Sequence, residues 1–397
     1  MSFIVKPNIL LPIKNIDMEK WAVIACDQFT SEPEYWDELK TIVDNVPSTY
    51  HLILPEAYLD RDMKHKVDKV NENMQLYLTH NMFEEHTGFI LVERKTPFVK
   101  RRLGLVIAID LEEYQYEPGK IGRIRATEET VPERIPPRVK IREKAPIELP
   151  HVLVLVDDKM DLVINDLYKN KKNYELLYNF DLNMNGGHIK GYKINEAESI
   201  IERIEKQSSD ISLIVGDGNH SLASAKVCWE NIKKNLPEKE LVDHPARYAL
   251  VELISLYDEG LTFEPIHRVI FNAEDDLIFG LKSVLHGDAV LNLFEGEKEL
   301  KISVPENPFT CIKIIQEYLD KYLETHPESE IDFIHGYKNI KSIVNKTRNS
   351  VGITMPPLKR DLLLPYIREF GVLPRKSFSL GEAEEKRYYL EGKRILK

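Results

Sequence analysis

Cysteine is scarce in this 397-residue chain. Its 3 cysteines, Cys26, Cys228 and Cys311, form no Cys-x-x-Cys pair. A sparse, odd set excludes a disulfide scaffold and fits a reducing compartment. No apolar run reaches membrane-spanning length, and the first residues lack the apolar core of a secretory signal. We therefore expect a cytoplasmic protein without a membrane partner.

Net positive charge is lacking as well. The formal net charge of -11 argues against nucleic acid as a partner and favours a small-molecule ligand. The hydrophobic content of 43% is that of a globular protein. The chain is long enough for two or three domains.

Several well-known catalytic motifs are also absent. The chain has no Gly-x-x-x-x-Gly-Lys-Ser/Thr, no His-Glu-x-x-His and no Gly-x-Ser-x-Gly. These absences exclude a P-loop, a zinc-protease helix and a hydrolase nucleophile elbow. The acidic run at residues 157–161 lacks the Asp-x-Asp-x-Thr spacing typical of aspartyl-phosphate phosphatases.

The apolar periodicity that is present predicts an α+β (mixed α/β) fold with mixed sheets. Ser31 is the expected N-cap of an early helix, with Glu34 as its capping-box partner. The proline-rich residues 119–150 indicate an ordered loop or a broken helix, either a solvated connector or an arm facing phosphate or carboxylate. The regular elements expected are strands over 3–12, 22–26 and 248–256, a hairpin over 88–111, and helices over 55–79, 196–207, 308–324 and 361–370.

The most informative stretch is residues 213–222, Leu-Ile-Val-Gly-Asp-Gly-Asn-His-Ser-Leu. An apolar strand ends there in a glycine-containing turn, and a helix begins at once. Its apolar face recurs every three or four residues: Leu222, Ala225, Trp229 and Ile232. A helix N-terminus offers N–H groups and a positive dipole end, which bind anions and most often phosphate. We therefore predict an anion site formed by Gly218, Asn219, His220 and Ser221.

Two titratable residues accompany this site. Asp217 suits proton transfer, although it could simply cap the helix. The positive helix end disfavours a cationic His220, so a neutral imidazole would donate to a phosphate oxygen or act as an acid or base.

The spacing Gly216-x-Gly218-x-x-Ser221 also approaches the dinucleotide-binding fingerprint. The acidic residue that should end the next strand is replaced by Glu238 and Glu240 in a polar loop. A nicotinamide-dependent dehydrogenase is therefore only a third class of function.

Four other positions each have two possible roles, one functional and one structural. Asp27, at a strand end, suits a general base or metal carboxylate, or a turn. Arg268, which follows His267, suits a bidentate phosphate clamp or a surface ion pair. The turn with Lys376 and Ser377 is either ligand-facing or solvated.

Residues 217–221 and the alanine-rich helix after them resemble the Asp-Gly-His-His-Arg-Tyr motif of the bacterial and archaeal family called domain of unknown function 1015. Four more segments fit the family's motifs, and they extend the resemblance over nearly the whole chain: residues 25–27, 125–128, 260–268 and 374–378. More remotely, the turn is similar to the phosphate-binding turn of the ParB/sulfiredoxin superfamily, which includes free-serine kinases.

The resemblance implies a ParB/sulfiredoxin-like phosphate-site domain over residues 1–275 and a C-terminal α/β domain over 276–397. It implies a phosphotransferase or phosphohydrolase acting on a small hydroxylated metabolite, serine or phosphoserine by analogy. Mg²⁺ with ATP or ADP would be the cofactors. Asp27, Asp217 and His220 would then be catalytic. The alternative is a non-catalytic regulator that binds a nucleotide or metabolite.

The chain departs from the family motif in two places. Asn219 stands where the motif has its first His, and Ser221 stands where it has the Arg that pairs with phosphate. The missing cation would have to come from Arg268, Arg125 or Lys376, and the sequence does not decide among them.

Overall fold

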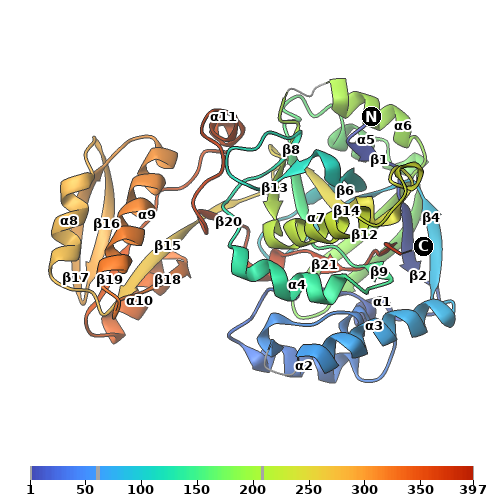
Figure 1. The fold of residues 1–397 in the computed structure, drawn as a ribbon, viewed down its shortest axis with the longest axis horizontal. Coiled ribbons are helices and arrows are strands. Elements are labelled where there is room, and N and C mark those ends of the chain that lie inside the picture. Colours follow the sequence, from blue (N-terminus) through green and yellow to red (C-terminus); the bar gives the residue numbers. More distant parts are fainter. Residues whose placement is uncertain (1, 60–62, 207–209, 397) are drawn as a thin grey trace. The chain divides into compact units, whose positions relative to one another are not determined.

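The computed structural model describes residues 2–59, 63–206 and 210–396 (Figure 1). It divides into two compact units. The larger unit comprises residues Met1–Ala126, Thr130–Leu261 and Glu382–Lys397, and the smaller unit comprises Thr127–Glu129 and Thr262–Gly381. None of the described helices is long and apolar enough to cross a bilayer.

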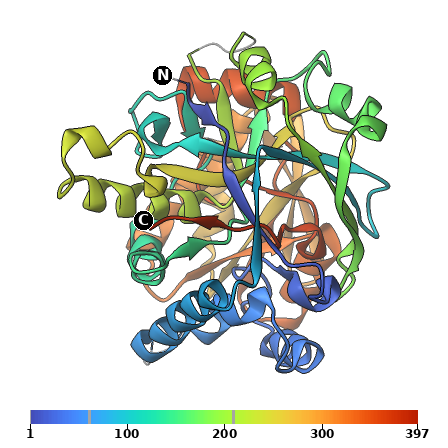
Figure 2. The same cartoon turned by 90° about the vertical axis from the view of Figure 1, so that its right-hand side faces the viewer.

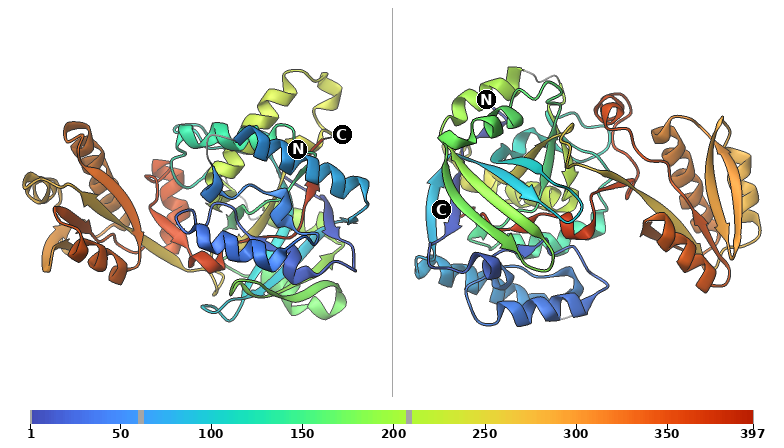
Figure 3. Two further views of the ribbon diagram at one scale, coloured as in Figure 1. Left: turned by 90° about the horizontal axis from the view of Figure 1, so that it is seen from below. Right: turned by 180° about the vertical axis from the view of Figure 1, so that it is seen from behind.

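A ten-stranded sheet forms the centre of the larger unit. Its pairs β10–β14, β13–β8 and β7–β8 are parallel, and its other pairs are antiparallel. The long β11–β12 hairpin is prominent in the right-hand view of Figure 3. The sheet order is β11 (Glu175–Leu182), β12 (Gly187–Ile194), β5 (Phe89–Lys95), β6 (Arg102–Asp110), β14 (Tyr248–Ser255), β10 (Leu153–Val156), β13 (Leu213–Asp217), β8 (Ile124–Ala126) and β7 (Tyr114–Gln115), with β1 (Ile4–Val5) paired to β6.

Every residue of β6 is buried, which explains why its sequence is an almost continuous apolar run. Three two-stranded pairs complete the unit: β2 (Asn8–Pro12) with β4 (Phe83–Thr87), β3 (Val23–Ile24) with β21 (Tyr388–Tyr389), and β9 (Ile147–Glu148) with β22 (Lys393–Arg394). Figure 2 shows β2 and β4 side by side. The last two pairs anchor the C-terminal segment, and the Trp21 indole donates to Leu390 O at 3.0 Å.

Helices cover this core. The α-helices of the larger unit are α1 (Met18–Trp21), α2 (Pro33–Val43), α3 (Met63–Thr79), α4 (Ile135–Arg142), α5 (Ile164–Lys169), α6 (Ala197–Lys206) and α7 (Asn219–Lys233). Its 3-10 helices are η1 (Thr49–Leu52), η2 (Glu56–Tyr58), η3 (Leu111–Glu113), η4 (Pro132–Arg134), η5 (Lys171–Asn173), η6 (Glu238–Glu240), η7 (Pro245–Arg247) and η8 (Ala383–Glu385). Helix α4 packs against α7, as Figure 1 shows.

The smaller unit is built on an antiparallel sheet. Its order is β17 (Lys298–Val304), β16 (Ala289–Glu295), β19 (Ser350–Ile353), β15 (Phe263–Phe271) and β18 (Glu330–His335), and β20 (Phe378–Leu380) pairs with β15. Its helices are α8 (Asp276–Val284), α9 (Pro308–Thr325), α10 (Tyr337–Lys346) and α11 (Arg360–Phe370). Asn307 caps α9 by accepting from two backbone N–H groups, which fixes where this helix begins.

The predicted mixed α/β fold is confirmed. The expected hairpin over 88–111 is β5–β6. The Ser31 cap was wrong: α2 follows Glu32, has Pro33 in its first turn and has no side-chain cap. Residues 119–150 are a broken segment that holds β8, η4, α4 and β9.

The compact units differ from the predicted division at residue 275. Strand β15 lies before that position, yet all of its sheet partners follow it, so the smaller unit starts at Thr262. Residues 382–397 return to the larger unit because β21 and β22 pair there.

Candidate functional site

The turn between β13 and α7 is made by Gly218. This residue has φ 82°, a left-handed conformation that glycine adopts without strain. A Cβ atom at this position would lie 3.1 Å from Val152 Cα, so a side chain would also crowd the neighbouring backbone. The chain thus turns directly from the sheet into a 15-residue helix. The N-terminus of α7 therefore lies at the end of β13.

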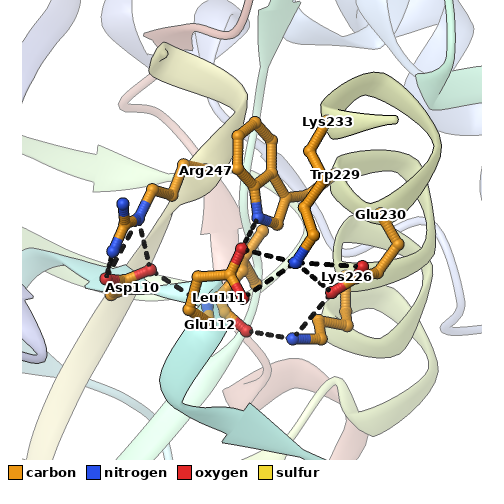
Figure 4. Close-up of polar contacts among 8 residues, drawn as sticks. All are labelled: Asp110, Leu111, Glu112, Lys226, Trp229, Glu230, Lys233 and Arg247. Atoms are coloured by element: carbon orange, nitrogen blue, oxygen red, sulfur yellow. Dashed lines mark hydrogen bonds and ion pairs between the residues drawn. The ribbon is translucent and has the colours of Figure 1, made fainter. Parts of the chain in front are cut away.

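Polar contacts fix the other side of α7 (Figure 4). Lys226 Nζ donates to Leu111 O at 2.8 Å, and the Trp229 indole donates to Glu112 at 2.6 Å. Lys233 reaches both oxygens of Glu112, at 2.8 and 3.0 Å. Lys226 and Trp229 are buried, so these bonds hold the helix in one orientation and thereby fix where its N-terminus points.

Asp217 forms an ion pair at this turn. Its Oδ1 accepts from Gly218 N at 2.8 Å, and its Oδ2 lies 3.0 Å from Lys386 Nζ. The N-cap of α7 is Gly218, and no side chain caps the helix. The capping alternative for Asp217 is therefore wrong, and its carboxylate instead holds a buried ammonium group beside the start of α7.

Lys386 reaches this position because two buried arginines bind the backbone before it. Arg94 donates to the carbonyls of Glu384, Glu385 and Lys386, at 2.8, 3.0 and 2.5 Å. Arg102 donates to Glu385 O at 3.0 Å. Burial, together with the charge of Arg102, lowers the pKa of Arg94 to about 9. These bonds fix the turn that directs Lys386 toward Asp217.

Arg387 fixes the same segment from the next position. It pairs with Glu252 at 2.8 Å and with Glu391 at 2.7 Å, and all three side chains are buried. The C-terminal segment is thus held on both sides of Lys386.

Asp27 lies in the same electrostatic cluster. Its Oδ2 is 3.8 Å from His151 Nε2, and its Oδ1 accepts from the Gln28 amide at 3.0 Å. Burial alone would raise the pKa of Asp27. The charge of His151, the Gln28 hydrogen bond and the charges of Lys386 and Arg138 outweigh burial and lower that pKa to about 2. Asp27 is therefore an ionised carboxylate, and Lys386 acts on both Asp27 and Asp217.

A chain of polar contacts extends behind Asp27. The Tyr389 hydroxyl lies 2.8 Å from His151 Nδ1 and 3.0 Å from Cys26 Sγ. Burial and the neighbouring Asp27 raise the pKa of Cys26 to about 11, so the thiol stays protonated. Cys26 is for that reason a poor nucleophile.

The other residues of the predicted anion site have separate surroundings. His220 Nε2 accepts from Val131 N at 3.0 Å, so His220 fixes the segment before η4. The Asn219 side-chain oxygen is buried and faces no donor among the described residues. Ser221 lines a pocket of about 120 Å³ together with His151 and Cys26.

Arg125 lies outside this cluster. It is buried on β8 and donates to Glu117 O at 3.1 Å. Burial lowers its pKa, and Tyr114 partly offsets that effect.

The remaining predicted residues meet in the smaller unit. The buried Arg268 guanidinium donates to the carbonyls of Ile266, Lys376 and Arg375, at 2.6, 2.9 and 3.4 Å, and to Gln316 at 3.0 Å. The same turn is bound through its backbone: the N–H groups of Lys376, Ser377 and Phe378 donate to Glu128, at 3.1, 2.9 and 3.1 Å. Arg268 and Glu128 therefore hold the 374–378 turn from two sides.

His267 is also occupied by the protein. Its Nδ1 accepts from Met355 N at 3.1 Å. Burial and the charges of Arg268 and His335 lower its pKa to about 4, which keeps the imidazole neutral at pH 7.

One group of side chains in the smaller unit has metal-ligand chemistry. Atoms of Glu274, Asp276 and His326 lie within 4.8 Å of one another. Both carboxylates are exposed, and His326 Nε2 lies 3.5 Å from Asp276 and 3.9 Å from Glu274. Surface ion pairing accounts for this arrangement.

The sequence did not reveal Lys386, His151, Tyr389 or Arg138 as members of the cluster. Tyr389 reaches the cluster through the pairing of β21 with β3, which places it opposite Val23. No local motif marks such a long-range pair.

The structure thus defines a mixed α/β protein in which a buried lysine pairs with Asp217 at a helix N-terminus and acts through its charge on Asp27. The model of the family described as "Protein of unknown function (DUF1015)" matches residues 10–341, and the chain belongs to this family. No curated protein matches the chain.

Three solved structures illustrate how remote its structural likenesses are. A conserved hypothetical protein from Pyrococcus furiosus is 12% identical with a TM-score of 0.37, over 72% of this chain and 90% of that chain. A free serine kinase in complex with AMP is 11% identical with a TM-score of 0.42, over 72% and 90%. C-terminally truncated SbnI from Staphylococcus aureus is 8% identical with a TM-score of 0.39, over 70% and 82%. The expected family resemblance is confirmed by the family model.

Proposed function

We propose that this protein is a phosphotransferase or phosphohydrolase for a small hydroxylated metabolite, with ATP or ADP as the phosphoryl partner. The observation that carries this proposal is the position of Lys386. Its ammonium group contacts Asp217 at the start of α7 and lowers the pKa of Asp27. An anion site and an ionised carboxylate therefore share one buried cation.

Phosphate would bind at the N-terminus of α7. The helix dipole and N–H groups attract an anion, and Gly218 leaves its own position free of a side chain. Lys386 would supply the cation that the motif loses at Ser221. It suits this role better than Arg125 or Arg268, because both of these guanidinium groups donate to backbone carbonyls elsewhere.

Asp27 would orient the hydroxyl group of the metabolite. In the transfer direction the hydroxyl oxygen bonds to the terminal phosphorus of the nucleotide, and the phosphoanhydride bond to the leaving phosphate breaks. The hydroxyl proton passes to Asp27 and then to water. Phosphoryl transfer depends mainly on positioning and charge neutralisation, so a carboxylate with a low pKa is adequate.

The carboxylates of the site are engaged by nitrogen atoms of the protein, so they are poorly placed to bind Mg²⁺ directly. Both Asp217 oxygens already accept hydrogen bonds, and each Asp27 oxygen lies near a nitrogen. Mg²⁺ accompanying the nucleotide would therefore be held by phosphate oxygens and water. Serine and phosphoserine are the first substrates to try, by analogy with the free serine kinases named above.

The test measures phosphoryl transfer by 31P NMR with ATP or ADP, Mg²⁺ and serine, and in reverse with phosphoserine. Lys386→Met and Asp27→Asn should each lower turnover by about 100- to 1000-fold, because each removes a group that stabilises or orients the transition state. Lys234→Met, on the exposed end of α7, is the matched control and should be unchanged.

Full turnover in both variants would overturn the proposal. Nucleotide binding by the wild type without any turnover would instead favour a non-catalytic nucleotide-binding regulator.

A further inference from the structure

A second feature adjoins the α7 N-terminus: the pocket of about 120 Å³ that Ser221 lines. A cavity of about 150 Å³ holds a benzene molecule, which has six non-hydrogen atoms, so this pocket has room for about five. It is closed on one side by α4 and on another by the first turns of α7, and Cys26, His151 and Tyr389 form one end. The pocket therefore touches the proposed phosphate site directly.

Most of the pocket wall is apolar. The side chains that form this wall are Leu52, Ile53, Leu54, Met74, Ile141, Ala145, Ile147 and Leu149. Such a wall favours a hydrocarbon body, at about 0.8 kcal/mol for each buried methylene group.

Two guanidinium groups of α4 supply the charge. Arg142 lies 2.5 Å from Glu148, whose other oxygen accepts from Leu250 N, so this pair is committed to the protein. Arg138 pairs with Glu56 and donates to Arg134 O at 2.8 Å. Arginine has five N–H donors, and the bonds to Arg134 O and Glu56 use its two terminal nitrogens. Arg138 therefore retains a donor and a cationic face for a ligand carboxylate.

The end formed by Cys26, His151 and Tyr389 suits a hydroxyl group. His151 lines the pocket there and lies 3.8 Å from Asp27. Ser221, in the first turn of α7, lines the same pocket. A hydroxyl placed at this end would lie between the carboxylate that accepts its proton and the helix end that binds phosphate.

We propose that the pocket binds the acceptor as a small hydroxy acid, with its carboxylate on Arg138, its hydroxyl toward His151 and its hydrocarbon body on the apolar wall. The role of this ligand as a phosphoryl acceptor rests on the proposed function, whereas its binding as a hydroxy acid does not. Serine is one member of this class, and a member with one more methyl group uses the apolar wall better.

The test is equilibrium binding by calorimetry without nucleotide. The probes are 3-hydroxypropionate, 3-hydroxybutyrate and serine, and the neutral controls are 1,3-propanediol and 1,3-butanediol. Each acid should bind at least tenfold more tightly than the diol of the same carbon number. The added methyl group of 3-hydroxybutyrate should tighten binding by about fourfold.

Variants separate the contributions of charge and shape. Arg138→Met should weaken acid binding at least tenfold and leave diol binding unchanged. Ile141→Phe, which fills the pocket, should weaken the binding of both. Lys140→Met, exposed on the same helix, should change neither. Thermal unfolding of each variant establishes that it is folded.

The outcomes distinguish this inference from the proposed function. Equal binding of acids and diols, or acid binding that survives Arg138→Met, overturns the hydroxy-acid pocket. Phosphoryl transfer to the diols alone also overturns the pocket but leaves the phosphotransferase standing. Arg138-dependent acid binding without any nucleotide-dependent transfer supports the pocket and rejects the phosphotransferase.

Discussion

Lys386 in the larger unit and Arg268 in the smaller unit are both buried cations, but their partners differ. Arg268 donates hydrogen bonds to three backbone carbonyls and to Gln316. Lys386 pairs with the Asp217 carboxylate and acts on Asp27 through its charge. A guanidinium saturated by carbonyls stabilises a turn, whereas an ammonium between carboxylates at a helix N-terminus can also attract an anion.

The carboxylates of the two units differ in the same way. Glu128 accepts three backbone N–H groups of one turn. Asp217 accepts one backbone N–H group and one ammonium group. The motif residues of the smaller unit thus bind one another, whereas Asp217 of the larger unit holds Lys386 beside the start of α7. Substitutions in each unit should break or preserve this contrast.

Replacing Arg268 should have the largest effect on stability. Arg268→Met leaves the carbonyls of Ile266 and Lys376 without their buried donor, so we expect the free energy of unfolding to fall by about 4 kcal/mol. Urea unfolding measures this loss. Lys376→Met changes an exposed side chain of the same turn and should alter stability by less than about 0.5 kcal/mol. Unchanged stability with lost phosphate binding in Arg268→Met would make Arg268 a ligand clamp and remove the contrast.

His267 should make stability depend on pH in the smaller unit. Its folded-state pKa is lowered from 6.5 to about 4. Between these values the unfolded chain binds a proton that the folded chain does not, so stability falls as the pH falls from 6.5 to 4, by about 2 to 3 kcal/mol. His267→Gln keeps an acceptor for Met355 N and should lose this dependence. Urea unfolding at several pH values measures the free energy of unfolding of both proteins. If it changes with pH to the same extent in both, the pKa of His267 is not lowered in the folded state.

Many helices and strands could be predicted because local sequence patterns determine them. The apolar run of β6 and the apolar spacing along α7 mark buried elements wherever they pair. The cap of α2 could not be predicted in this way, because Ser31 and Glu32 both precede Pro33 and tertiary packing decides where the helix begins. The unit boundaries also depend on strand pairing, which joins Tyr388 to Ile24 across most of the chain.

The candidate site was predictable only in its local half. The glycine turn and the helix start at Gly218 follow from adjacent residues. Lys386 is fixed by Arg94 and Arg102, which lie almost 300 residues earlier. Such side-chain contacts leave no spacing pattern in the sequence, so the sequence suggests Arg268, Arg125 or Lys376 as the cation and does not reveal Lys386.

Replacing His220 should have the smallest effect on stability. The result distinguishes a structural role of His220 from a catalytic one. As an acceptor for Val131 N it resembles the residues of the smaller unit, which bind their own backbone. His220→Ala should then cost about 1 kcal/mol of stability. His220→Gln, whose amide oxygen can accept the same bond, should restore both stability and turnover to within about threefold of wild type. If His220→Gln is stable but its turnover falls 100-fold and the pH profile loses a limb, the imidazole is an acid or base. His220 would then belong with Asp27 and Lys386 in the ligand-facing part of the larger unit.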